Sequence, residues 1–137
     1  MKELLLVDDN DRYARILEKY FARYGYRSTR AVYGHEALRI MEEKGVDAFD
    51  LVVTDITMES QLAGISMLRK MHAMGLRSPI IVASTGFDVV LAKTLGRFWL
   101  KRYGVTYLVP KTTVLAENLL FYPMDGSAPH HDFEAKK

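Results

Sequence analysis

Four apolar runs in this chain each end in polar residues, and this repeated pattern constrains the fold more than any other feature. The runs and the residues that follow them are 4–7 with Asp8 and Asp9, 51–54 with Asp55, 80–83 with Ser84, and 107–109 with Pro110 and Lys111. Short runs rich in Leu, Val and Ile are typical of strands covered on both faces, as in a parallel sheet. Sites in open parallel sheets form at the carboxyl ends of the strands, so we expect these polar side chains at one edge.

Between these runs the chain repeatedly changes to helical spacing, so strands and helices are expected to alternate. The expected strands are 3–7, 26–31, 50–54, a run that begins at Pro79, and 105–109. The expected helices are 11–24, the stretch from Gly34 toward Gly45, 62–74, 88–103 and 112–121. Crossovers of helical length join parallel strands, and their right-handed course places helices on both faces of the sheet. The predicted fold class is therefore α/β, with a five-stranded parallel sheet.

Length and composition fit one cytoplasmic domain followed by a tail. A chain of 137 residues, 49% hydrophobic and 26% charged, has an ordinary globular composition and room for one core. It has no cysteine, a net charge of only +2, and no apolar stretch long enough for a secretory signal or a membrane span. From Pro123 on, prolines, a glycine and few apolar residues predict mobility. We expect a domain at 1–122 and a flexible tail at 123–137.

Three carboxylates are expected to lie together at the functional edge. Asp8 and Asp9 follow one strand and Asp55 follows its neighbour, and like charges this close cost free energy unless a cation lies among them. Ligands that are all oxygen suit a hard ion such as Mg²⁺. An alternative for Asp8 and Asp9 is that they cap the helix that begins near Asp11. Asp55 favours the metal site, because three acids on two adjacent strand ends rarely serve turns alone.

A hydroxyl and an ammonium are expected at the same edge. Ser84 and Lys111 follow the two remaining strands, and charge-assisted donors of this kind bind the oxygens of a phosphoryl group. Taken singly, a residue such as Ser84 is more often a loop residue, and one such as Lys111 is more often a solvated surface lysine. Their shared position with the acids is what indicates a phosphate-binding role.

The order and spacing of these motifs point to one family. The chain contains, in this order, Asp8-Asp9, Gly34-x-Glu-Ala-Leu, Asp55-Ile-Thr-Met, Pro79-Ile-Ile-x-x-Ser84 and Lys111. Together they resemble the receiver domain of two-component response regulators, from Lys2 to about Leu120. Each motif alone is weakly specific, so the resemblance depends on their combination. It implies a flavodoxin-like sheet with the strand order 2-1-3-4-5.

The resemblance also implies a chemistry. A carboxylate nucleophile would attack phosphorus and form an acyl phosphate, and the domain would catalyse only its own phosphorylation and dephosphorylation. The implied roles are Asp55 as phosphoryl acceptor, Asp8, Asp9, Asp55 and the backbone carbonyl of Thr57 as Mg²⁺ ligands, Lys111 as a contact of the phosphoryl group, and Ser84 as the switch hydroxyl that moves toward it. The implied donor is a sensor histidine kinase or a histidine phosphotransfer protein.

Three features depart from the family pattern. Glu59 stands where the family usually has proline, in a loop one residue longer than usual, and Thr85 stands where a small residue is typical. The usual Lys-Pro is here Pro110-Lys111, so counting from Gly104 puts Lys111 at the site, whereas counting from Tyr107 puts Pro110 there. Lys111 is favoured because proline cannot supply a charge.

A second surface is expected to carry the signal outward. The helix at 88–103 has more apolar residues than one buried stripe needs, which indicates either an exposed contact surface or cover by neighbouring elements. The residues expected at this surface are Val90, Arg97, Phe98, Lys101 and Tyr107. Tyr107 is either the aromatic partner of the switch or a core residue. The expected partners are a downstream protein and a second copy of the chain, and neither nucleic acid nor a membrane is expected.

Two hypotheses of different classes follow. The first is a single-domain receiver, a Mg²⁺-dependent phosphoryl switch that signals through the surface made by the helix at 88–103, the strand at 105–109 and the helix at 112–121. The second is a degenerate receiver that binds a partner without phosphorylation. The three departures favour the second hypothesis, whereas the retention of all three acids with a hydroxyl and a lysine favours the first, which is the leading one. A small hydrolase with an Asp nucleophile is disfavoured, because Thr57 stands where its second catalytic Asp belongs.

Overall fold

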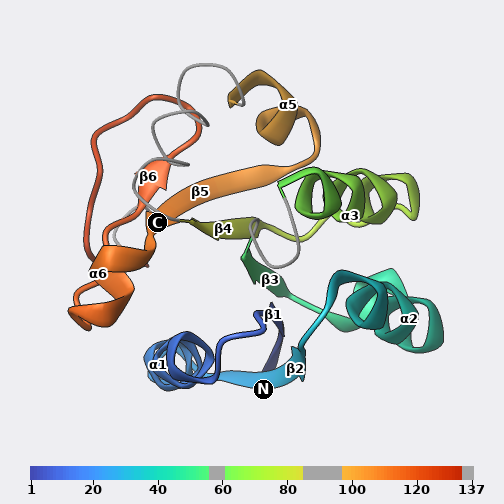
Figure 1. The fold of residues 1–137 in the computed structure, drawn as a ribbon, viewed down its shortest axis with the longest axis horizontal. Coiled ribbons are helices and arrows are strands. Elements are labelled where there is room, and N and C mark those ends of the chain that lie inside the picture. The colour runs from blue at the N-terminus through green and yellow to red at the C-terminus, as the bar shows by residue number, and fades with distance from the viewer. Residues whose placement is uncertain (56–60, 85–96, 134–137) are drawn as a thin grey trace.

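The computed structural model describes residues 1–55, 61–84 and 97–133, and over these residues it shows a six-stranded sheet between layers of helices (Figure 1). The strands are β1 (Lys2–Val7), β2 (Tyr26–Ala31), β3 (Leu51–Asp55), β4 (Ile80–Ser84), β5 (Val105–Pro110) and β6 (Tyr122–Pro123). Their order is β2-β1-β3-β4-β5-β6, parallel up to β5. The predicted parallel sheet of order 2-1-3-4-5 is confirmed, and the antiparallel β6 is an addition that the sequence did not predict.

The helices divide between the two faces of the sheet (Figure 1). They are α1 (Asp11–Ala22), α2 (Gly34–Lys44), α3 (Gln61–Ala73), α5 (Arg97–Arg102) and α6 (Lys111–Leu115), with a 3-10 turn η1 (Val46–Ala48). Helices α1 and α6 cover one face, and α2 and α3 cover the other. Of the helix expected at 88–103, the structure describes the part that forms α5. None of the described helices has the length and apolar character needed to cross a membrane.

Both faces of the sheet are buried, which explains why the strand sequences are almost continuously apolar. On β1, Leu4 and Leu6 pack toward α1, whereas Leu5 and Val7 pack toward α2 and α3. All four side chains are fully buried. Burying a side chain of this kind contributes about 1.5–3 kcal/mol relative to leaving it exposed. The two resulting cores fix the position of each strand end, and the strand ends carry the polar residues.

The end of the chain differs from the expected long helix. The sequence predicted a helix over 112–121, but α6 ends at Leu115, because Glu117 adopts a left-handed backbone conformation with φ of 54°. Such a conformation is unfavourable for a residue with a side chain and cannot continue a right-handed helix. The chain then turns back, Phe121 pairs with His130 in an antiparallel bridge, and β6 pairs with β5.

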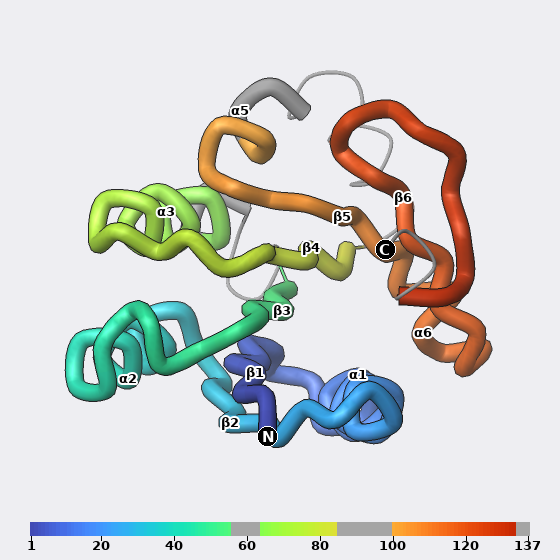
Figure 2. Tube along the Cα trace, turned by 180° about the vertical axis from the view of Figure 1, so that it is seen from behind, coloured from blue at the N-terminus to red at the C-terminus, as the bar shows by residue number. Residues whose placement is uncertain are grey.

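The residues after β6 pack on the domain, in contrast to the mobile tail expected from Pro123. Phe133 is the centre of an aromatic cluster, with its ring centroid 5.2 Å from Phe21, 5.7 Å from Phe121 and 5.8 Å from Tyr24. The Phe133 amide also donates to the Tyr20 hydroxyl at 3.2 Å. We call residues 116–133, which include β6, the C-terminal segment. Figure 2 shows its part after β6 looping away from that strand and returning toward α6. Its order comes from partners far away in sequence, which local composition does not reveal.

Candidate functional site

The register of the sheet brings the polar strand ends to one edge. Val7 pairs with Thr54, so Asp8 and Asp55 emerge side by side from β1 and β3. Across the sheet Ser84 pairs with Pro110, and Lys111 follows as the first residue of α6. The structure therefore places together the predicted residues Asp8, Asp9, Asp55, Ser84 and Lys111, and it places Lys111 rather than Pro110 at the site.

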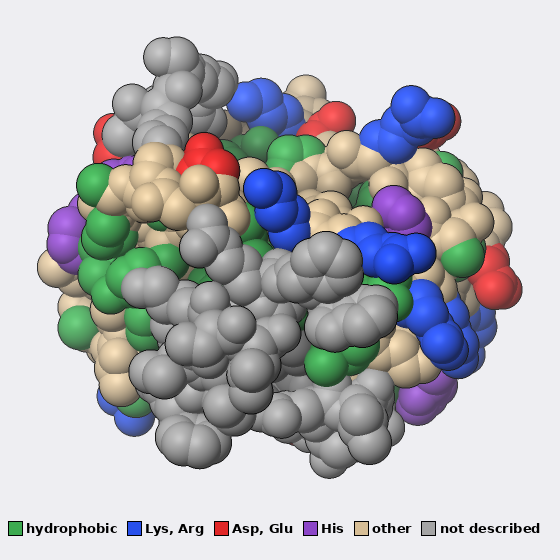
Figure 3. Space-filling model, turned by 90° about the horizontal axis from the view of Figure 1, so that it is seen from above, with side chains coloured by type: hydrophobic (Ala, Val, Ile, Leu, Met, Phe, Trp, Pro, Cys, Tyr) green, Lys and Arg blue, Asp and Glu red, His purple; other side chains and the backbone are tan. Residues whose placement is uncertain are grey.

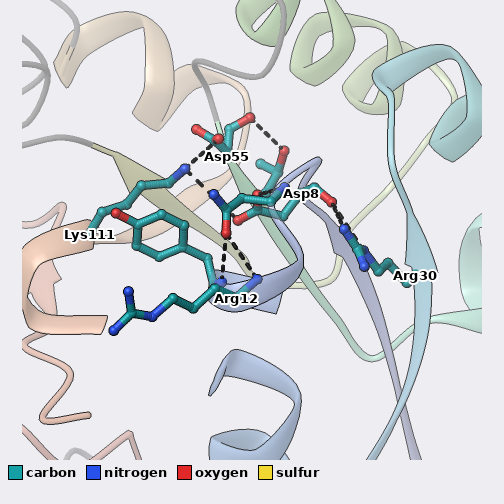
Figure 4. A network of polar contacts seen from close by, with 8 residues as sticks. Asp8, Arg12, Arg30, Asp55 and Lys111 are labelled. Atoms are coloured by element: carbon teal, nitrogen blue, oxygen red, sulfur yellow. Dashed lines mark hydrogen bonds and ion pairs between the residues drawn. The ribbon is translucent and has the colours of Figure 1, made fainter. Parts of the chain in front are cut away.

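The centre of the site is a buried ion pair between Lys111 and Asp55 (Figure 4). The Lys111 Nζ lies 2.6 Å from the Oδ2 of Asp55 and 4.0 Å from the Oδ2 of Asp8. Asp8 is 0%, Asp55 3% and Lys111 7% exposed, whereas Asp9 is exposed. Removing one member of such a pair leaves an uncompensated buried charge, so the three side chains form one electrostatic unit.

Asp8 is held in an environment that disfavours its charge. Burial, aided by the nearby charges of Asp55 and Asp9, raises the pKa of Asp8 from 3.8 to about 6. The hydrogen bond from the Asn10 amide to its Oδ1, at 2.9 Å, and the charge of Lys111 act in the opposite direction. Because burial outweighs the Lys111 charge, the ionised form of Asp8 is destabilised unless a further cation lies beside it.

The three carboxylates fit a divalent cation. One oxygen each of Asp8, Asp9 and Asp55 lies within 4.8 Å of the others. The Oδ2 of Asp8 is buried and accepts no hydrogen bond from the described residues. An unpartnered oxygen in a cluster of oxygen donors is suited to a hard ion such as Mg²⁺, which is usually held by a few carboxylates and water.

The structure adds two groups around Asp8 that sequence reasoning missed. Arg30, at the end of β2, donates from Nε and Nη2 to the Asp8 carbonyl oxygen at 3.1 and 2.9 Å, and it pairs with Asp11 at 2.6 Å (Figure 4). Asn10 caps α1 by accepting hydrogen bonds from the Arg12 and Tyr13 amides. The signal for Asn10 was present, because Asn is a preferred capping residue, whereas nothing in the local sequence distinguishes Arg30 from other strand arginines.

Several predicted residues fall in parts of the chain that the structure does not describe. Thr57, Glu59, Thr85 and Val90 lie outside the described residues, as do the side chains of Arg97 and Phe98 in α5. Lys101 is exposed. Figure 3 shows Lys and Arg side chains at several places on one face of the molecule.

Tyr107, also expected at the outer surface, packs instead against the C-terminal segment. Its ring centroid lies 5.5 Å from His130 and 5.6 Å from Phe121. Because these partners belong to residues 116–133, Tyr107 is partly enclosed by the chain's own C-terminal segment.

Comparison with known proteins agrees with this arrangement. The family model of the response regulator receiver domain matches residues 4–98. The response regulator SaeR of Staphylococcus epidermidis is 32% identical over 130 residues, which cover 93% of this chain and 53% of that protein. The transcriptional regulatory protein ZraR of Salmonella typhimurium is 34% identical over 88 residues, which cover 64% of this chain and 19% of that protein. The chain thus spans about half and about a fifth of these two relatives.

Solved structures show the same fold. A receiver domain protein from Clostridium thermocellum superposes with a TM-score of 0.66 at 20% identity, covering 86% of this chain and 92% of that one. The chemotaxis protein CheY4 of Vibrio cholerae gives a TM-score of 0.65 at 20% identity, covering 85% of this chain and 94% of that one. With the family model matching more than half of the sequence, this chain belongs to the response regulator receiver domain family.

Proposed function

We propose that this receiver domain is a phosphorylation-dependent switch in which Asp55 accepts the phosphoryl group. The observation that carries the proposal is the 2.6 Å contact between Lys111 and Asp55, inside a cluster of three carboxylates in which one Asp8 oxygen accepts no hydrogen bond from the described residues. A purely structural ion pair would not need two more acids beside it. The same cluster argues against a phosphorylation-independent interaction module, because it retains a costly arrangement of like charges.

In the proposed step a carboxylate oxygen of Asp55 attacks the phosphorus atom of the donor. A P–O bond forms to Asp55 while the bond from phosphorus to the donor breaks, and the electron pair of that bond leaves with the donor group. With phosphohistidine the leaving group is an imidazole nitrogen, and with acetyl phosphate it is acetate. The product is an acyl phosphate, which returns to Asp55 and inorganic phosphate when water attacks the phosphorus.

The residues that would hold Mg²⁺ are Asp8, Asp9 and Asp55, with the backbone carbonyl of Thr57 as a further proposed ligand. When bound, Mg²⁺ neutralises negative charge on the transferring group, which is the larger part of catalysis in phosphoryl transfer. Asp8 contributes to this site through its buried position and its unpartnered oxygen. Arg30 donates to the carbonyl of Asp8 and the Asn10 amide donates to its Oδ1, and these two contacts leave the Oδ2 for the metal.

Lys111 and Ser84 would change their contacts when Asp55 is phosphorylated. The Lys111 ammonium already contacts a carboxylate oxygen of Asp55, so on phosphorylation it would follow the negative charge to the phosphoryl oxygens. Ser84, buried at the end of β4, would donate its hydroxyl to the same group. Drawing Ser84 inward would shift the end of β4 and, through it, the surface near α5.

The proposed partners follow from this chemistry. The phosphoryl donor would be a sensor histidine kinase or a histidine phosphotransfer protein of the cytoplasm, and the receiver would pass its state to a downstream protein or a second copy. We place the output on α5, β5 and α6, with Lys101 exposed there. Since β6 pairs with β5 and Tyr107 contacts residues 116–133, the C-terminal segment forms part of this surface.

The test is the intact mass of the protein after incubation with acetyl phosphate and Mg²⁺. The proposal predicts the mass of one added phosphoryl group in the wild type, and none in Asp55→Asn or when a chelator removes the metal. An adduct that forms equally in Asp55→Asn, or equally without metal, would refute the assignment. A folded wild type that neither forms an adduct nor binds Mg²⁺ would favour the interaction module.

A further inference from the structure

Lys111 has a neighbour whose role neither the sequence nor the proposed chemistry explains, the aromatic ring of Tyr13. The Lys111 Nζ lies 4.4 Å from the centroid of this ring. Tyr13 is half-buried and lies in the first turn of α1, whereas Lys111 is the first residue of α6. The contact therefore links two helices that are far apart in the sequence. A cation at this distance from a ring face is attracted by the negative charge density of the ring.

The backbone of Tyr13 is tied to the metal-binding strand end. Its amide donates to the Asn10 Oδ1 at 3.1 Å, and the Asn10 amide donates to the Asp8 Oδ1 at 2.9 Å. Two hydrogen bonds therefore connect the ring-bearing residue to Asp8. The backbone position from which the ring projects is thus tied to Asp8 by contacts that do not involve Lys111.

The lysine needs such a partner because its main contact changes during the reaction. The ammonium is almost fully buried and pairs with the Asp55 oxygen at 2.6 Å, and a lysine side chain has four flexible bonds. When Asp55 becomes an acyl phosphate, that ion pair must be exchanged for contacts with the phosphoryl oxygens. The ring contact involves no atom of Asp55, so the chemical change at Asp55 does not itself remove it.

We infer that Tyr13 is a positioning residue for Lys111: its ring holds the ammonium beside Asp55 while the phosphoryl group arrives. The inference deepens the proposed function and rests on it. The ring makes the contact, so phenylalanine at this position preserves it and leucine abolishes it. Loss of a partly desolvated cation–π contact that acts in the transition state corresponds to about a tenfold slower reaction.

The test compares the rate of adduct formation with acetyl phosphate and saturating Mg²⁺ in the full chain. Tyr13→Leu is expected to be about tenfold slower than wild type, and Tyr13→Phe to restore the rate to within about twofold. Tyr33→Leu is the matched control, since Tyr33 is 46% exposed and stacks on His35 instead. Equal rates in wild type and Tyr13→Leu, or a Tyr13→Phe as slow as Tyr13→Leu, would overturn the inference.

A double-mutant cycle separates positioning from general damage to the fold. If Tyr13 acts through Lys111, Tyr13→Leu changes nothing further in a Lys111→Met background. An equal slowing in both backgrounds would overturn the inference, because it would show an effect that does not pass through the lysine. The Mg²⁺ affinity of Tyr13→Leu, which retains all carboxylates, is expected to match the wild type and verifies that the site is intact.

A second readout does not depend on phosphorylation. The ring current of Tyr13 shields the protons beside the Lys111 ammonium, so their NMR signals are expected upfield in wild type and Tyr13→Phe and at ordinary positions in Tyr13→Leu. Wild-type signals without this shift would overturn the inference. Failure of the proposed function can be told apart from failure of this inference. If Asp55 is not a phosphoryl acceptor, neither wild type nor any variant forms an adduct, and the NMR shift still shows whether the Tyr13 ring contacts the lysine.

Discussion

Replacing Asp8 by asparagine is expected to stabilise the metal-free protein, although it removes a residue of the site. The carboxylate is fully buried, and its pKa is raised from 3.8 to about 6, chiefly by burial. Asparagine has nearly the same shape and keeps an oxygen that accepts the Asn10 amide, which lies 2.9 Å from Oδ1. The substitution therefore removes the charge and leaves the local hydrogen bond in place.

The magnitude follows from the difference between the two pKa values. A group with a folded pKa near 6 and an unfolded pKa of 3.8 lowers the stability of the fold, at pH well above 6, by about 3 kcal/mol. The attraction to Lys111, whose Nζ lies 4.0 Å away, is already contained in this difference, because the Lys111 charge acts on the pKa of Asp8. The net gain is smaller because the buried amide group of asparagine is itself polar and is costly to bury. We expect Asp8→Asn to raise the free energy of unfolding by about 1–3 kcal/mol at pH 8 with chelator present.

The sign of the pH dependence is fixed by the direction of the shift. Because the folded pKa is raised, the folded protein binds a proton more readily than the unfolded chain, so the wild type becomes more stable as pH falls through about 6. The advantage of Asp8→Asn should therefore fall to about half at pH 5 and disappear below the unfolded pKa. Taking the difference between variant and wild type cancels the titration of the other groups.

In the presence of Mg²⁺ the wild type, and not Asp8→Asn, should have the higher free energy of unfolding. A ligand at 100 times its dissociation constant stabilises the folded state by about 2.7 kcal/mol, which only the wild type should gain in full. The assay is urea unfolding followed by circular dichroism, with chelator or with Mg²⁺. Asp9→Asn is the matched control: Asp9 is exposed, so its metal-free stability should change by less than about 0.5 kcal/mol. An Asp8→Asn variant less stable than wild type at pH 8 without metal would refute the reasoning.

Three further predictions concern the groups that support the site and the C-terminal segment. Arg30→Met removes two hydrogen bonds to the Asp8 carbonyl and should weaken Mg²⁺ binding about tenfold by calorimetry, whereas Arg27→Met, which loses an exposed pair with Glu3, should not. Phe121→Ala empties a fully buried site and should lower the free energy of unfolding by about 3–5 kcal/mol; a loss under 1 kcal/mol would mean that the C-terminal segment does not pack as described. Glu117→Gly relieves a left-handed backbone and should stabilise by up to about 1 kcal/mol in urea unfolding, and destabilisation would contradict this.

The parallel sheet and the grouping of the site were predictable because each rests on a local pattern. The apolar run before Asp8 is continuous because both faces of β1 are covered. The end of this run marks the strand end, where a polar side chain can take part in a site. The same holds for Asp55 and Ser84. Parallel topology then brings strand ends to one edge without any knowledge of individual contacts.

What the sequence did not reveal depends on contacts between distant residues. The apolar spacing of Leu115, Leu119 and Leu120 resembles a helix, yet Glu117 breaks it and Phe121 packs among aromatic rings of α1 and the C-terminal segment. The contact between the Tyr13 ring and the Lys111 ammonium joins two residues that lie far apart in the sequence. No local propensity encodes either contact, because both are decided by packing across the sheet.

The central claim, that Asp55 is the metal-dependent phosphoryl acceptor, is tested most directly by locating the modified residue. Borohydride reduces an acyl phosphate of aspartate to homoserine, which peptide mass spectrometry assigns to one position. After treatment with acetyl phosphate and Mg²⁺, the account predicts homoserine at position 55, and none there when a chelator replaces the metal. Homoserine at Asp8 or Asp9 instead, or equal conversion of Asp55 without metal, would contradict it.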